Sequence, residues 1–166
     1  MKRQLYGFKL LAAVLAAFTL CGTATAGKPP VPFKGQSTGV ITTLGFDPVL
    51  GVVSTRSEGQ GEATHLGRFT VTADVAVYLF TPVVIGNWTY VTENGDKLFA
   101  HMIGGPGPDP LHGVGAFTIT GGTGRFRGAS GSYQQIITFA FPGGSVPVDP
   151  YSDVLFNGTI SYPGAE

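Results

Sequence analysis

The clearest pattern in this sequence is Phe69-Thr70-Val71-Thr72-Ala73-Asp74-Val75-Ala76-Val77-Tyr78-Leu79. Its six odd positions are all apolar, and its first three even positions are polar. Successive side chains of a β-strand point to opposite faces, so a strict alternation predicts a strand that is half-buried. From Ala76 to Phe80 the residues on both faces are apolar.

The same period of two continues along most of the chain. Val154, Phe156, Ile160 and Tyr162 share one parity near the C-terminal end. After residue 26, 24 glycines and 12 prolines separate such stretches, which predicts many tight turns, and no long helical period occurs. The sequence therefore predicts an all-β fold, a closed antiparallel barrel of about eight strands. A lipocalin-like barrel and a β-sandwich are the alternative architectures.

The first 26 residues have the three parts of a secretory signal peptide. Basic residues precede an apolar run from Leu10 to Leu20, and Ala24 and Ala26 supply small residues before a cleavage point. Bulky Leu20 before Cys21 argues against a lipoprotein signal. We expect a mature chain of residues 27–166 that forms a single domain, with a flexible lead-in at 27–32, and that is secreted or periplasmic.

Composition after residue 26 excludes several classes of function. Seven basic and ten acidic residues give a net charge of −3, which argues against nucleic-acid binding. No further segment is long and apolar enough for an integral membrane helix. The mature chain has no cysteine, and His65, His101 and His112 lack metal-site spacing. We therefore expect no metal and no cofactor.

The turn signal Glu93-Asn94-Gly95-Asp96 predicts a hairpin with a two-residue type I′ turn at Asn94-Gly95. That turn would place Trp88 opposite His101, and Tyr90 opposite Phe99. One face would then carry a candidate ligand-binding cluster: Trp88, Tyr90, Phe99 and His101. A histidine among aromatic rings can donate a proton or hydrogen-bond a ligand. The opposite face is also largely apolar, so a subunit or loop should cover one of the two.

The segment Thr120-Gly121-Gly122-Thr123-Gly124-Arg125-Phe126-Arg127-Gly128-Ala129-Ser130-Gly131 lacks the lysine of a phosphate-binding loop. A strand-like stretch, residues 132–141, follows it where such a loop would need a helix. We interpret it as a structural turn with Phe126 buried and Arg125 and Arg127 outside. Two loops rich in glycine and proline, Gly104 to Pro110 and Pro142 to Pro150, are the expected rim of any cavity.

This glycine-rich segment resembles the turn of allene oxide cyclase-like and dirigent-like barrels. Ala63-Thr64-His65-Leu66-Gly67-Arg68-Phe69 similarly resembles a stretch of uncharacterised bacterial secreted proteins. The resemblance implies an eight-stranded antiparallel barrel with a central apolar cavity, often assembled as a trimer. It covers about a dozen residues and carries over no catalytic residue, so the catalytic residues are unknown.

Three functions fit these observations. The first is non-enzymatic binding of a small apolar ligand, which we favour because the sequence offers no convincing acid–base or nucleophile pair. Glu62 and Asp74 are acid–base candidates that a solvated strand face explains as well. The second is an isomerase or cyclase that steers a reactive intermediate in the barrel cavity, as the resemblance implies. The third is a structural envelope protein.

Overall fold

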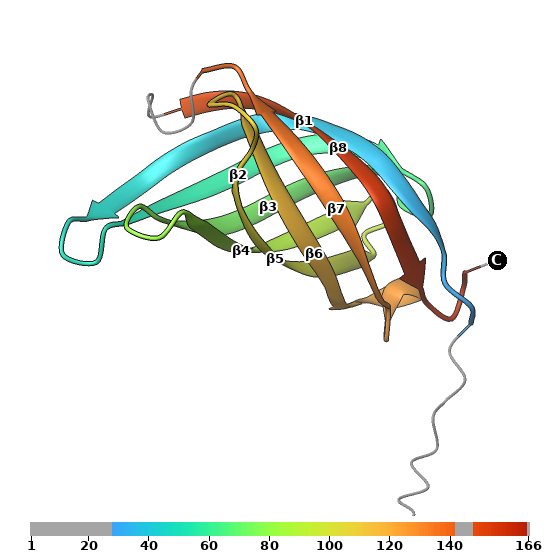
Figure 1. Ribbon diagram of the computed structural model, residues 1–166. Helices are drawn as coiled ribbons and strands as arrows, with labels where there is room; N and C mark the ends of the chain where they lie inside the picture. The colour runs from blue at the N-terminus through green and yellow to red at the C-terminus, as the bar shows by residue number, and fades with distance from the viewer. Residues whose placement is uncertain (1–27, 142–147, 166) are drawn as a thin grey trace, which may run out of the picture.

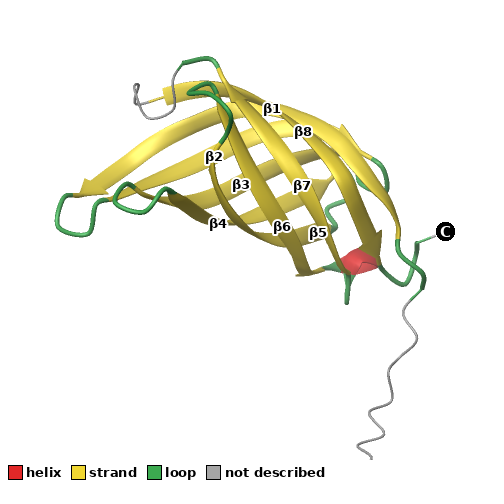
Figure 2. Ribbon diagram, in the orientation of Figure 1, coloured by secondary structure: helices red, strands yellow, loops and turns green. Residues whose placement is uncertain are grey.

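A computed structural model describes residues 28–141 and 148–165, which form one closed antiparallel barrel (Figure 1). Its strands are β1 (Val31–Asp47), β2 (Val52–Ala63), β3 (Gly67–Tyr78), β4 (Val83–Thr92), β5 (Lys97–Pro106), β6 (His112–Gly122), β7 (Ser130–Phe139) and β8 (Val148–Ser161). They pair in chain order, and β8 closes the barrel on β1. One short 3-10 helix, η1 (Gly124–Phe126), joins β6 to β7 (Figure 2). The predicted eight-stranded barrel is confirmed.

The alternation in β3 agrees with the prediction over most of the strand. Phe69, Val71 and Ala73 are buried inside the barrel, and the threonines between them are exposed. Leu79 departs from the prediction, because the strand ends at Tyr78 and Leu79 lies in the following turn, 55% exposed. The expected lead-in at 27–32 is also shorter than predicted, because β1 already begins at Val31.

The predicted register of the β4–β5 hairpin is wrong by one residue. Trp88 lies opposite Ala100, and Asn87 lies opposite His101. The loop is longer than two residues: Gly95 N–H donates to the Thr92 carbonyl at 2.9 Å, and Thr92 N–H donates to the Asp96 carbonyl at 3.0 Å. Within this loop, only Gly95 has a positive φ, 84°. These features define a three-residue loop with a glycine bulge, which Asn-Gly also suits. A slip of one residue moves every side chain of β5 to the other face.

The glycine-rich segment folds as the predicted structural turn. Phe126 is fully buried, and its ring centroid lies 5.2 Å from that of Tyr162. The backbone N–H of Thr123 donates to the Lys97 carbonyl at 2.8 Å, which joins this turn to the neighbouring β4–β5 hairpin. Arg125 and Arg127 are exposed, and β7 follows at Ser130. The prediction that Phe126 is buried is confirmed.

The barrel has two unlike ends. The β2–β3, β4–β5 and β6–β7 connections lie together at one end, which we call the closed end (Figure 1). The β1–β2, β3–β4 and β5–β6 connections lie at the opposite end, which we call the mouth (Figure 1). The largest fully buried apolar side chains lie in the half nearer the closed end: Phe33, Leu98, Phe117, Phe126, Tyr133 and Ile160. The predicted signal peptide, and the side chains of Val154 and Phe156, lie outside what the structure describes.

Candidate functional site

The four residues of the predicted ligand-binding cluster are divided between the two faces of the barrel wall. Trp88 and Tyr90 point into the barrel and are 5% and 2% exposed. Phe99 and His101 are half-buried on the outer face, as the corrected register requires. There, His101 Nδ1 lies 3.0 Å from Asn87 Oδ1. The cluster therefore does not form, and only its two β4 residues face the lumen.

Trp88 and Tyr90 belong instead to a layer of aromatic rings across the barrel. Phe117 is its centre: its ring stacks on Tyr133, with centroids 4.6 Å apart, and meets Trp88 edge-on at 4.9 Å. Tyr90 Oη and Tyr133 Oη are 2.6 Å apart, although β4 and β7 are not neighbours in the sheet. We call this set the aromatic layer: Phe33, Phe69, Trp88, Tyr90, Phe117 and Tyr133. It fills the barrel and forms the floor of the space toward the mouth.

Glycines on the inner face give these rings their room. A Cβ at Gly86 would lie 2.6 Å from the Trp88 ring, and one at Gly115 would lie 2.9 Å from both Met102 and Phe117. Real Cβ atoms do not approach so closely, so each glycine lets a large side chain lie flat on the neighbouring backbone. Part of the glycine content is thus explained by packing inside the barrel as well as by turns.

Polar side chains line one side of the interior. Ser57 on β2, Ile41 on β1 and Asp149 on β8 lie in one row of the sheet, and residues paired directly across antiparallel strands share a face. Since Ser57 and Asp149 are 6% and 4% exposed, this shared face is the inner one. We call the buried polar residues of β1, β2, β7 and β8 the polar wall: Ser37, Thr55, Ser57, Gln135, Asp149 and Tyr151.

The opposite side of the lumen is apolar. We call it the apolar wall, and it comprises Val71, Ala73, Val75, Val84 and Met102 on β3, β4 and β5. Val75 and Val84 are only partly buried, as are Ile137 and Phe139 on the inner face of β7. Inward-facing side chains remain partly exposed only where solvent reaches the inner surface. Solvent therefore reaches the inner face on the mouth side of the aromatic layer, between one polar and one apolar wall.

Asp149 is the one buried acidic residue of the described chain. Its Oδ1 accepts a hydrogen bond from the Phe141 backbone N–H at 3.2 Å, and its Oδ2 has no hydrogen-bond partner among the described residues. A buried carboxylate oxygen without a donor is costly, so it usually has a use. Because the oxygen is itself buried, a ligand donor reaches it only if the groups that cover it move aside. The sequence did not single out Asp149 because it lies in Pro142 to Pro150, which we expected to be a loop.

The other polar candidates lie on outer surfaces. Glu62 is exposed, and Asp74 accepts hydrogen bonds from the Arg56 guanidinium, the shorter at 2.7 Å. Near the mouth, His112 Nδ1 lies 2.7 Å from Asp109 Oδ1, and hydrogen bonds from His112 and from a backbone N–H lower the pKa of Asp109. Within the described residues, no group of histidine and carboxylate side chains could hold a metal ion.

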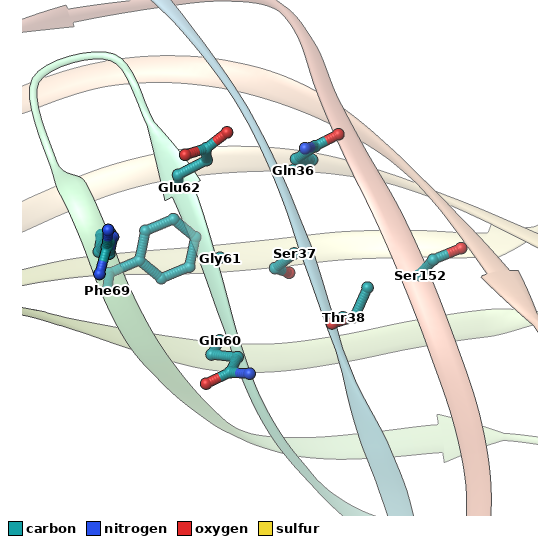
Figure 3. A pocket seen from close by; sticks show the side chains of 9 residues that line it. Gln36, Ser37, Thr38, Gln60, Gly61, Glu62, Phe69 and Ser152 are labelled. Carbon is teal, nitrogen blue, oxygen red and sulfur yellow. The ribbon is translucent and has the colours of Figure 1, made fainter.

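A second hollow, of about 680 Å³, runs over β1, β2, β3 and β8 (Figure 3). Most of its polar lining side chains are solvent-exposed on the outer face: Gln36, Thr38, Gln60, Glu62, Arg68 and Ser152. Ser37 and Phe69, which also line it, are buried, each 4% exposed. Exposed polar groups already bind water, so they contribute less to ligand affinity than buried ones. We therefore take the lumen between the two walls as the candidate functional site.

Comparison with known proteins adds little to this description. No protein-family model matches the chain, and no curated protein matches it. Among solved structures, the chain is similar to a pterocarpan synthase dirigent protein, with 14% sequence identity and a TM-score of 0.47. The match covers 79% of this chain and 91% of that one. The barrel architecture itself rests on the strand pairing described above.

No helix within the described residues is long and apolar enough to cross a membrane.

Proposed function

We propose that this protein is exported and binds a small, largely apolar ligand without transforming it, in the lumen between the mouth and the aromatic layer. The observation that carries the proposal is the division of the lumen into an apolar wall and a polar wall. Binding pockets for small molecules typically combine mostly apolar surface with a few placed polar groups.

The two walls suggest how such a ligand lies. Its apolar part would pack on Val75, Val84 and Met102, and a hydroxyl or amine donor at its polar end would reach Asp149 Oδ2. Burying the apolar part contributes about 25 cal/mol per Å² of area removed from water. The hydrogen bond to a charged oxygen adds selectivity, because a ligand without a donor leaves that oxygen unsatisfied.

The test uses Trp88, the only tryptophan of the chain, as a reporter. Its ring lies in the aromatic layer, at the floor of the proposed site. Purified protein is titrated with the fluorescent apolar probe 1-anilinonaphthalene-8-sulfonate, and energy transfer from Trp88 to the probe is recorded. We expect energy transfer that saturates as the probe is added. A long-chain alcohol should displace the probe and so reduce the transfer, and the alkane of equal length should displace it less well.

Variants locate the probe. Val84→Asp places a charge on the apolar wall and should abolish transfer, whereas Ser152→Asp, on the outer face beside the second hollow, should leave it unchanged. Val84→Asn, an uncharged change, keeps the test valid if Val84→Asp does not fold. If energy transfer is lost in Ser152→Asp and kept in Val84→Asp, the probe binds in the outer hollow and not in the lumen. Native mass spectrometry of the protein as exported then reports any ligand that it retains.

Asp149 also supports a second function, an isomerase or cyclase that steers a reactive intermediate. A buried carboxylate on the inner face of the barrel can exchange a proton with a bound molecule. Chromatography of the ligand released after incubation separates the two functions, because isomers share one mass but differ in retention. A ligand recovered unchanged after incubation supports binding alone, and an isomer of the same mass whose formation needs Asp149 supports the enzyme.

A further inference from the structure

We propose that the mouth of the barrel docks on the surface of a lipid bilayer whose headgroups carry no net charge, through apolar side chains at the tips of two hairpins. These residues form what we call the apolar collar: Leu44, Phe46, Val49, Leu50, Leu79 and Phe80. The proposal is independent of any ligand in the lumen.

The apolar collar is among the most exposed apolar surface of the described chain. Val49, Leu50 and Phe80 are 84%, 64% and 74% exposed, and they occupy the β1–β2 and β3–β4 turns rather than a strand face. In Figure 1 both turns lie at the mouth, and the β1–β2 tip is the part of the barrel farthest from η1 in this view. Turns in soluble proteins are usually polar, so several large apolar residues gathered there indicate an interaction surface.

Hydrogen bonds within the β1–β2 turn hold its tip in one conformation. Asp47 Oδ1 accepts hydrogen bonds from the backbone N–H groups of Val49 at 2.9 Å and Leu50 at 3.1 Å, which fixes the turn that presents both side chains. Leu44 is left without a partner in the register of β1 and β2, at a bulge between Thr43 and Gly45.

The two tips are joined to each other. Leu79 N–H donates to the Gly51 carbonyl at 2.8 Å, and the ring of Phe80 lies against Gly51, where a Cβ would meet it at 2.6 Å. Gly51 has a φ of 61°, so it supplies both the left-handed turn and the space for the ring. The apolar collar is therefore held as one surface before any partner binds.

Charge decides which partner suits this surface. Six of the seven basic residues after residue 26 lie toward the closed end: Lys28, Lys34, Arg68, Lys97, Arg125 and Arg127. The seventh, Arg56, pairs with Asp74 on the outer wall. The described part of the mouth carries Asp47 and Asp109 and no Lys or Arg. Binding to anionic lipid depends on basic residues near the surface, so the collar suits uncharged or zwitterionic headgroups.

A second copy of the chain fits less well. A two-fold contact between mouths brings each patch against the same patch of its partner, so Asp47 and Asp109 would face other carboxylates with no basic residue at the described mouth to offset them. A zwitterionic bilayer imposes no such repulsion. Both hairpin tips can also insert into such a bilayer at once, with their apolar side chains among the headgroups and the upper acyl chains.

Flotation of the purified exported protein with phosphatidylcholine vesicles tests the proposal. We expect wild type to float with the vesicles, and Val49→Ser combined with Phe80→Ser to reduce the partition coefficient by about tenfold or more. Adding phosphatidylglycerol at low salt should weaken wild-type binding. The control is Ile103→Ser, which removes an apolar side chain that is 57% exposed on β5, outside the collar. It should bind like wild type.

Three outcomes would overturn the proposal: no flotation of wild type, equal loss in the Ile103 variant, or stronger binding when phosphatidylglycerol is added. Sedimentation velocity without vesicles tests the second copy, because a dimer that the double variant dissolves would assign the collar to self-association. If the double variant does not fold, Leu50→Ser alone replaces it in the flotation test. Changing one exposed side chain leaves the packing contacts of the barrel intact.

Discussion

Tyr90 and Tyr133 join two strands that are not neighbours in the sheet, with their hydroxyl oxygens 2.6 Å apart inside the barrel. Three strand-to-strand steps separate β4 from β7 around the wall, so this hydrogen bond crosses the lumen. Phe117 stacks on Tyr133 beside it, and Phe69 meets Tyr90 edge-on at 5.2 Å. The pair therefore fixes the depth at which packed interior gives way to the open lumen.

Removing this bond should loosen the floor of the lumen. We expect Tyr90→Phe and Tyr133→Phe each to lower the free energy of unfolding by about 1 kcal/mol, the usual net value of a protein hydrogen bond. The double variant should lose less than the sum of the two, because both changes remove the same bond. Urea unfolding of all four proteins measures this coupling, and strictly additive losses would show that the hydroxyls do not interact.

Phe126 should matter far more to stability than the arginine beside it. Phe126→Ala empties a fully buried site at the closed end and should cost about 3–5 kcal/mol. Arg125 has a side chain 41% exposed and donates to the Leu66 carbonyl at 3.2 Å, so Arg125→Ala should cost less than about 1 kcal/mol.

Thermal unfolding of both variants beside wild type measures this difference, and adding nucleotide tests the rejected phosphate-loop function. A neutral Phe126 variant would contradict the structural role of the turn. A nucleotide-dependent rise in melting temperature that Arg125→Ala removes would show that the segment binds phosphate after all.

The sequence predicts the barrel because its alternation is direct evidence of strands, and β3 shows this from Phe69 to Ala73. It fails at the β4–β5 turn because Asn-Gly suits both a two-residue turn and a three-residue loop with a glycine bulge. The Thr92 side chain, which hydrogen-bonds Asn94 Oδ1 and the Asp96 carbonyl, favours the longer loop. One residue of register then decides whether His101 faces the lumen or the outside.

The candidate site was harder to predict than the strands. Its two walls come from strands that close on each other only in the finished barrel, and pairing of β8 with β1 joins residues more than a hundred positions apart. Asp149 was also missed because its neighbour Pro150 favoured the prediction of a loop. In the structure Pro150 lies opposite Val40 within β8, exposed on the outer face, so the strand continues through it.

Acid should selectively remove one contact near the mouth. Hydrogen bonds from His112 and the Leu111 backbone N–H lower the pKa of Asp109 below its ordinary value of 3.8. The stability that the ionised Asp109 contributes is therefore present above that ordinary value and is lost as pH falls through the lowered pKa.

We expect Asp109→Asn to melt below wild type at about pH 6, and the difference to shrink as pH falls below 3.8 through the lowered pKa of the wild-type carboxyl. Differential scanning fluorimetry at a series of pH values measures this difference. A gap that widens on acidification would contradict the direction of the shift.

Export should leave Gly27 as the first residue. Ala24 and Ala26 supply the small side chains that a signal peptidase requires, after a short apolar segment. Expression in a Gram-negative host, followed by separation of periplasm from cytoplasm and intact-mass measurement, tests both the cleavage point and the compartment. A product that starts at Met1, or at a lipid-modified Cys21, would overturn the prediction of a secreted or periplasmic chain that begins at Gly27.

Asp149 should oppose stability and support binding. Asp149→Asn keeps an oxygen to accept the Phe141 N–H bond, and it removes a buried charge whose second oxygen has no donor among the described residues. Removing an uncompensated buried charge relieves a desolvation cost, so the melting temperature should stay the same or rise. Probe displacement by a long-chain alcohol should weaken by about tenfold, since a hydrogen bond to a charged group is worth about 1.5–3 kcal/mol. Displacement by the alkane of equal length should not change.

The control is Ser57→Ala, which alters the same row of the polar wall without changing its charge. It should weaken displacement of the probe by the alcohol less than Asp149→Asn does. A variant that melts well below wild type and displaces the probe as before would show that Asp149 serves the fold, and that the ligand, if any, binds elsewhere in the lumen.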